Sequence, residues 1–61
     1  EIEKPINAAE LPANLLAKYE LMITEYDHII LEKVYKFNGD NGFEFCCYKD
    51  QKLTKLEFEN L

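Results

Sequence analysis

The chain has 61 residues, of which 48% are hydrophobic, and its 12 acidic and 7 basic side chains give a net charge of −5. This length allows one domain with one small core, and the hydrophobic content excludes a disordered chain. Phosphate binding depends on clustered Lys and Arg, so the acidic balance argues against a nucleic-acid partner. No apolar run approaches the ~20 residues of a membrane span, so we expect no membrane insertion.

Residues 1–9 form a predicted lead-in, in which Pro5 blocks an early helix. Asn7 and Glu10 have the spacing of a capping box. Pro12 is tolerated only in the first turn of a helix. Apolar residues then recur at intervals of three and four, as in an amphipathic helix: Leu15, Leu16, Tyr19, Met22, Ile23 and Tyr26. These signals predict a helix over residues 10–26.

A longer helix is the main alternative. Ile30, Val34 and Phe37 continue the apolar spacing, so the helix could run on to about residue 37. We favour the earlier end because residues 28–31 are β-prone. A longer helix would also leave the next strand with one partner, and an isolated two-stranded hairpin is marginal in water.

The rest of the chain predicts three strands, over residues 29–37, 43–49 and 52–59. The middle strand is the most β-prone stretch, and turn-forming residues lie at 38–42 and 49–52. We therefore predict an α+β fold over residues 1–61, as a single small domain. One N-terminal amphipathic helix packs on a three-stranded antiparallel meander, in the order α-β-β-β.

Cross-strand chemistry predicts the register of the first hairpin. Placing Phe37 opposite Phe43 across a five-residue turn brings Lys36 opposite Glu44. This register combines an aromatic pair with an opposite-charge pair, and both kinds of pair stabilise a sheet.

The second hairpin is predicted to close with Asp50-Gln51 at its tip. Phe45 then lies opposite Leu56, and Phe43 lies opposite Phe58. A shift by two residues, with a four-residue loop, keeps the same faces and remains an alternative.

The chain shows no pattern typical of a nucleophile or a metal site. Cys46 and Cys47 are adjacent in a predicted strand, so their thiols point to opposite faces and do not chelate one ion together. We expect Cys47 to be buried and Cys46 to be more exposed. His28 is the only histidine and lies at the helix–strand junction, away from Cys46. We therefore expect no catalytic residue, no metal, no cofactor and no enzymatic activity.

Two acidic features have simpler explanations than a site. The segment Asn38-Gly39-Asp40-Asn41-Gly42 resembles the first half of a calcium loop, but Lys49 stands where an EF-hand needs Glu. A hairpin turn explains these residues. Glu44 and Glu57 are predicted to lie opposite each other on a solvated sheet face, with lysines nearby that keep both ionised.

The outer sheet face and the strand edges are the remaining candidates for function. Four residues interrupt the polar outer face and form a candidate protein contact: Val34, Cys46, Tyr48 and Leu53. Lysines along the outer strands guard edges that another chain could still pair with. We therefore predict a small, non-catalytic protein-binding or inhibitory module, whose partner is another protein or a second copy of the chain. The alternative is a structural or oligomerising element, or half of a larger domain.

From about Ile6 onward the chain resembles the PepSY-like small domains of secreted bacterial proteins, described as β-lactamase-inhibitor-like. Glu10-Leu11-Pro12 opens a short helix, and three strands follow, the last bearing Leu56-Glu57-Phe58. The resemblance implies an exported, periplasmic or extracellular, non-catalytic binding or inhibitory module, often one of two tandem units. It carries over no functional residues, and without it the compartment is unknown.

Overall fold

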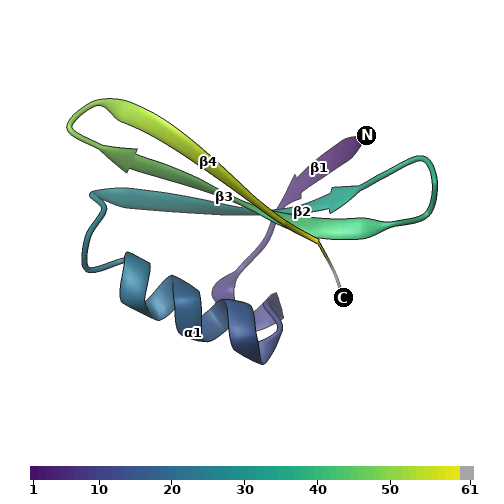
Figure 1. Ribbon diagram of the computed structural model, residues 1–61, viewed down its shortest axis with the longest axis horizontal. Coiled ribbons are helices and arrows are strands. Elements are labelled where there is room, and N and C mark those ends of the chain that lie inside the picture. The colour runs from purple at the N-terminus through teal and green to yellow at the C-terminus, as the bar shows by residue number, and fades with distance from the viewer. Residues whose placement is uncertain (60–61) are drawn as a thin grey trace.

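The computed structural model describes residues 1–59; Asn60 and Leu61, the last residues of the predicted domain, lie outside this range. The elements, in chain order, are β1 (Ile2–Pro5), a 3-10 helix η1 (Ala8–Glu10), α1 (Ala13–Met22), β2 (His28–Tyr35), β3 (Asn41–Lys49) and β4 (Lys52–Glu59). The strands form one antiparallel sheet in the order β1-β2-β3-β4, and α1 lies on one side of it (Figure 1). The predicted α+β class is confirmed.

The predicted number of strands is wrong, because residues 2–5 of the expected lead-in form β1. Ile2 pairs with Tyr35, and Pro5 pairs with Glu32, along the edge of β2. The backbone N–H of Ile6 continues this contact by donating to the carbonyl of Leu31 at 3.0 Å. Glu, Lys and Pro have low strand propensity, so this strand depends on its pairing with β2. A proline is tolerated here because β1 is an edge strand.

The helical region is split and shorter than the predicted range of 10–26. Leu11 precedes a proline and is extended (φ −79°, ψ 144°), which ends η1. Pro12 takes the N-cap position of α1, and Glu10 accepts a hydrogen bond from the Asn7 N–H at 2.8 Å. After α1, the N–H of Asp27 donates to a β3 carbonyl at 2.8 Å. The chain has therefore turned into the sheet before β2, which excludes the long-helix alternative.

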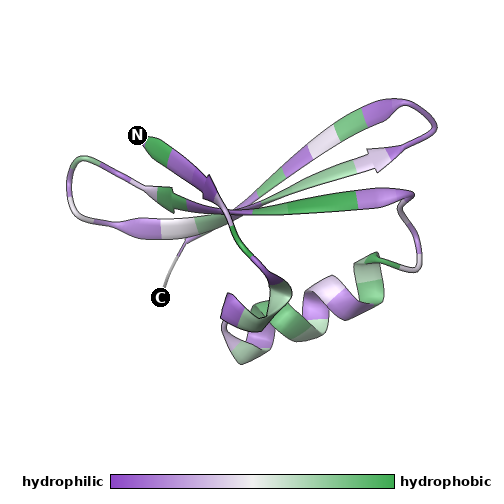
Figure 2. Cartoon of the chain, turned by 180° about the vertical axis from the view of Figure 1, so that it is seen from behind, coloured by the Kyte–Doolittle hydropathy of each residue, from purple (hydrophilic) through white to green (hydrophobic). Residues whose placement is uncertain are grey.

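The second hairpin has the predicted two-residue tip. Asp50 and Gln51 both have positive φ, 50° and 66°, as a type I′ turn requires. β4 spans the predicted residues 52–59, with Phe45 opposite Leu56 and Phe43 opposite Phe58. The alternation of hydrophobic and hydrophilic residues along β4 is visible in Figure 2.

The predicted register of the first hairpin is wrong by four residues. Leu31, not Tyr35, lies opposite Phe45, and Ile29 lies opposite Cys47. The predicted register would have placed Leu31 opposite Lys49, at the end of β3, and Ile29 beyond it. Burying an aliphatic side chain is worth about 1.5–3 kcal/mol, whereas an opposite-charge cross-strand pair contributes about 0.2–1 kcal/mol. The observed register therefore buries the aliphatic residues and leaves Phe37 in the loop, 93% exposed.

The two glycines explain where this hairpin turns. Gly39 has a φ of +91° and lies in the loop over residues 36–40, which Asn38 closes by accepting the N–H of Asp40 at 3.0 Å. Gly42, expected in the turn, lies instead within β3, where a Cβ atom would approach the carbonyl oxygen of Phe58 to 2.7 Å. Gly39 therefore allows the positive φ of the turn, and Gly42 allows the close approach of β4 to β3.

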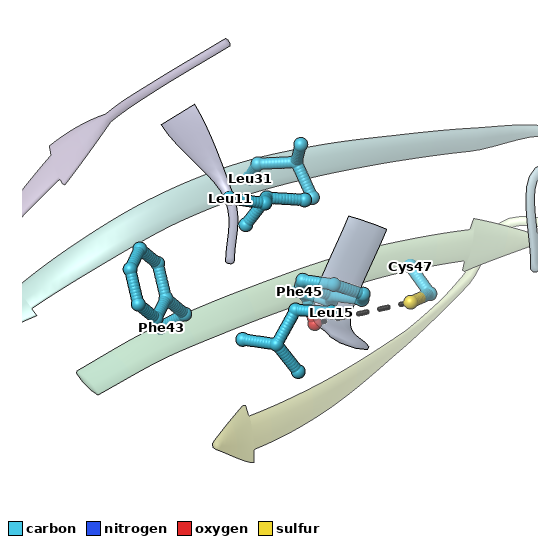
Figure 3. Close-up of a cluster of buried hydrophobic side chains, with 6 residues drawn as sticks. All are labelled: Leu11, Leu15, Leu31, Phe43, Phe45 and Cys47. Atoms are coloured by element: carbon cyan, nitrogen blue, oxygen red, sulfur yellow. Dashed lines mark hydrogen bonds between the residues drawn. The ribbon is translucent and has the colours of Figure 1, made fainter. Parts of the chain in front are cut away.

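The core lies between α1, η1 and the inner face of the sheet. Its buried side chains are Leu11, Leu15, Leu31, Phe43, Phe45 and Cys47 (Figure 3). Phe45 is fully buried, with its ring centroid 6.2 Å from that of Tyr19 and 4.8 Å from that of Phe58, both in edge-to-face geometry. α1 and β4 therefore both contact β3 through the ring of Phe45.

We predict that Gly42→Ala lowers the free energy of unfolding by about 1–3 kcal/mol, the usual cost of overpacking. The new methyl group would force β3 and β4 apart at Phe58. Urea unfolding followed by far-UV circular dichroism measures this change. A variant as stable as the wild type would contradict the close approach.

We predict that Gln51→Gly raises the free energy of unfolding by about 0.5–1 kcal/mol, because glycine adopts positive φ without strain. The matched control is Lys52→Gly, the next residue and the first of β4, where glycine should destabilise. The same urea titrations compare the two variants. Equal effects at the two positions would show that the turn geometry is not responsible.

Candidate functional site

The candidate site lies on the outer face of the sheet, opposite α1. In Figure 1, no helix within residues 1–59 covers this face. Strand pairing places these side chains on it: Glu3, Pro5, His28, Ile30, Glu32, Val34, Glu44, Cys46, Tyr48, Leu53, Lys55, Glu57 and Glu59. The face is polar in the middle and apolar towards the Asp50-Gln51 turn.

Three carboxylates from three neighbouring strands converge at the middle of this face. Glu3 comes from β1, Glu32 from β2 and Glu44 from β3, and one carboxylate oxygen from each lies within 4.8 Å of the others. We call these residues the acidic cluster. Glu32 and Glu44 are direct cross-strand partners. Like charges in that position destabilise a sheet, so the cluster carries an electrostatic cost.

Glu44 is the most unusual member of the acidic cluster, because it is a buried acid. Only 3% of its surface is exposed, and its Oε2 atom has no hydrogen-bond partner. The neighbouring Glu3 carboxyl group, followed by burial, raises the pKa of Glu44 from 4.5 to about 7. Lys55 opposes this shift, with its Nζ atom 4.0 Å from Oε1 of Glu44. The single positive charge of Lys55, whose side chain is exposed, does not balance the charges of the three carboxylates of the acidic cluster.

The two cysteines point to opposite faces, as their adjacency predicts. The Cys47 thiol faces the core and donates to the carbonyl oxygen of Phe45, with a sulfur–oxygen distance of 3.8 Å (Figure 3). The Cys46 thiol faces the acidic cluster and donates to Oε1 of Glu32 at 3.4 Å. Cys46 is the more exposed of the two, as predicted, but both are buried, with exposed fractions of 7% for Cys46 and 0% for Cys47. Burial raises the pKa of the Cys46 thiol to about 11, so the neutral thiol is the stable form.

The four residues of the candidate protein contact share the outer face but differ in accessibility. Val34 and Cys46 are buried, at 3% and 7% exposure, and offer little surface to a partner. Tyr48 is half-buried, and Leu53 is 48% exposed. The accessible apolar surface therefore lies at one end of the face, around Tyr48 and Leu53.

The other polar candidates are engaged in structural contacts. His28 lies opposite Tyr48, with ring centroids 6.1 Å apart, beside a surface pocket of about 280 Å³. The carboxylate of Asp27 at the same pocket accepts the backbone N–H of Asp50 at 3.1 Å. In the loop over residues 36–40, the side chain of Asp40 accepts a hydrogen bond from Asn38 at 3.1 Å. Glu44 and Glu57 lie opposite each other, as predicted.

Comparisons with known proteins give no family for this chain: no family model matches it, and no curated protein or solved structure matches it significantly.

Sequence reasoning identified Glu44 but did not find the acidic cluster. Glu3 fell in the expected lead-in, and the predicted register placed Lys36, not Glu32, opposite Glu44. The cluster needs both β1 and the four-residue change of register. The alternation of Glu3 with Ile2 and Lys4, next to a strand edge, is a weak signal that sequence alone does not distinguish from a solvated terminus.

We predict that Glu44→Gln stabilises the protein by about 1 kcal/mol at pH 8 in the presence of a chelator, because it removes a like-charge pair and gives a buried donor to its neighbours. The measurement is urea unfolding. Glu59→Gln, an exposed position on the same face opposite Gly42, is the matched control and should change stability by less than about 0.5 kcal/mol. A Glu44→Gln variant less stable than this control would contradict the cost assigned to the acidic cluster.

Proposed function

We propose that this chain is a small, non-catalytic protein-binding module that accepts a partner strand along the free edge of β4. The observation that carries the proposal is the edge itself. β4 is eight residues long, terminates the sheet, and is exposed at six of these residues. A strand edge presents backbone N–H and C=O groups that pair with another extended chain.

The hairpin geometry supports this proposal by setting which residues of β4 face outward. Lys49 and Lys52 close the two-residue turn. The closing pair of such a hairpin is hydrogen-bonded, and bonded residues alternate along each strand. The backbone groups at alternate positions therefore point to the free edge: Leu53, Lys55, Glu57 and Glu59.

The charges along β4 favour a second copy of the chain as the partner. If two β4 strands pair in antiparallel fashion about Leu56, Lys55 of each copy lies opposite Glu57 of the other. The two neighbouring registers that keep the same faces centre on Lys55 or on Glu57, and they place two lysines or two glutamates together. Opposite-charge pairs favour the first register, and like charges disfavour the other two.

The same edge would serve a different protein with a similar alternation of charges. The resemblance to PepSY-like domains favours that version, an exported module that binds or inhibits another protein, and we propose it on that resemblance alone. A chain whose only partner is itself would favour the alternative function, a structural or oligomerising element. We propose no nucleic-acid partner, because the net charge is −5. Within residues 1–59, neither helix is long and apolar enough to cross a bilayer.

We predict a weak dimer, because a single strand pair buries less than the ~1,200 Å² of a standard interface. Sedimentation equilibrium over a wide concentration range, in chelator and reductant, measures it. Glu57→Lys should weaken the dimer by placing two lysines opposite each other in each pair. The charge swap Lys55→Glu with Glu57→Lys should restore it, since each pair is again oppositely charged.

Two results would contradict the proposed β4 dimer. One is a wild type that remains monomeric at all concentrations. The other is a Glu57→Lys variant that dimerises as strongly as the wild type, which would locate the contact elsewhere. Circular dichroism of each variant confirms that the fold is retained.

A further inference from the structure

We propose that Glu3, Glu32 and Glu44 form a binding site for a divalent cation, and that Ca²⁺ is the cation that fits it best. The three residues lie on three adjacent strands, and one carboxylate oxygen of each lies within 4.8 Å of the others. Hard divalent cations are bound in proteins mainly by carboxylate oxygens, backbone carbonyls and water. This site is separate from the β4 edge and does not depend on the proposed dimer.

The strongest sign of a missing ligand is the buried end of Glu44. Its side chain is 97% buried, and its Oε2 atom has no partner among the described residues, although the Glu44 carboxylate belongs to the acidic cluster. A buried polar atom without a partner costs about 1–3 kcal/mol, so folded proteins normally satisfy such atoms with protein groups, water or ions. A cation bound by both oxygens of the Glu44 carboxylate would satisfy Oε2.

The charge of the site also matches a divalent ion. When all three carboxyl groups are ionised, they and the ammonium group of Lys55 carry a net charge of −2. Glu32 and Glu44 are direct cross-strand partners, an arrangement that is unfavourable unless a cation lies between them. The Lys55 side chain is 58% exposed, so it can swing into solvent when an ion enters.

Coordination geometry favours Ca²⁺ over Mg²⁺. Ca²⁺ takes six to eight oxygen ligands in flexible geometry at about 2.3–2.6 Å, whereas Mg²⁺ requires near-ideal octahedral geometry at about 2.0–2.1 Å. The three oxygens lie within 4.8 Å of one another, a separation that ligands of one Ca²⁺ can have. Glu3 is exposed, which leaves room for the water ligands that complete the coordination shell.

A cation at this site would clamp β1 to the rest of the sheet. β1 has four residues, all exposed, and pairs only with β2. The ion would link Glu3 on β1 to Glu32 on β2 and Glu44 on β3. Binding should therefore stabilise the folded chain and slow the opening of β1 in particular.

The test is thermal unfolding of the full chain in EDTA, in CaCl₂ and in MgCl₂, with ionic strength matched by NaCl. We expect CaCl₂ at concentrations well above its dissociation constant to raise the Tm by about 5 °C or more, and MgCl₂ to raise it less. Glu44→Gln should lose this increase. Glu59→Gln, which removes a carboxylate from the same face outside the cluster and opposite Gly42, should keep it.

Amide hydrogen exchange provides a second measurement. CaCl₂ should increase the protection of the Lys4 and Ile6 amides, which face β2, in the wild type and leave it unchanged in Glu44→Gln. No increase in Tm in the wild type, or an equal increase in both glutamine variants, would overturn the proposal. If Glu44→Gln does not fold, Glu32→Gln takes its place in both measurements.

Discussion

The packing of Phe45 against Tyr19 on one side and Phe58 on the other is the contact on which the rest of the structure depends. This ring is fully buried and lies at the middle of β3. Edge-to-face aromatic pairs add about 0.5–1.5 kcal/mol each beyond the burial of their surface. In a chain of 61 residues, where the core is small, such a contact is a large share of the net stability. It joins α1 and β4 to β3 at a single point.

The demand for burial around Phe45 also decides the chemistry of the opposite face. Placing Leu31 under the helix, opposite Phe45, brings Glu32 opposite Glu44 on the outer face. The register that pairs Lys36 with Glu44 would relieve this repulsion, but it would remove two aliphatic residues from the core. Burial is worth several times the charge pair, so the acids remain together. β1 then adds Glu3 to the same place.

The outer face and the β4 edge are available because one short helix covers only one side of a four-stranded sheet. These two regions offer different chemistry. The edge presents backbone groups and alternating charges, which suit another polypeptide. The acidic cluster presents convergent carboxylates, one of them buried, which suit a small cation. The proposed cation would act on the fold through β1, at the opposite end of the sheet from β4.

The sequence by itself determined the α+β class, because this class depends on local periodicity. It also predicted the two-residue tip at Asp50-Gln51 and the register of the second hairpin, and the structure decided between this register and the four-residue loop. The sequence also determined that Glu44 faces away from the helix, since side chains alternate along a strand. Only the tertiary structure decided the existence of β1, the register of β2 against β3, and therefore the acidic cluster. The physical reason is that these depend on competition for burial between residues far apart in the chain. Local propensity favours a solvated terminus for residues 2–5 and a charge pair for Lys36, and the core overrides both.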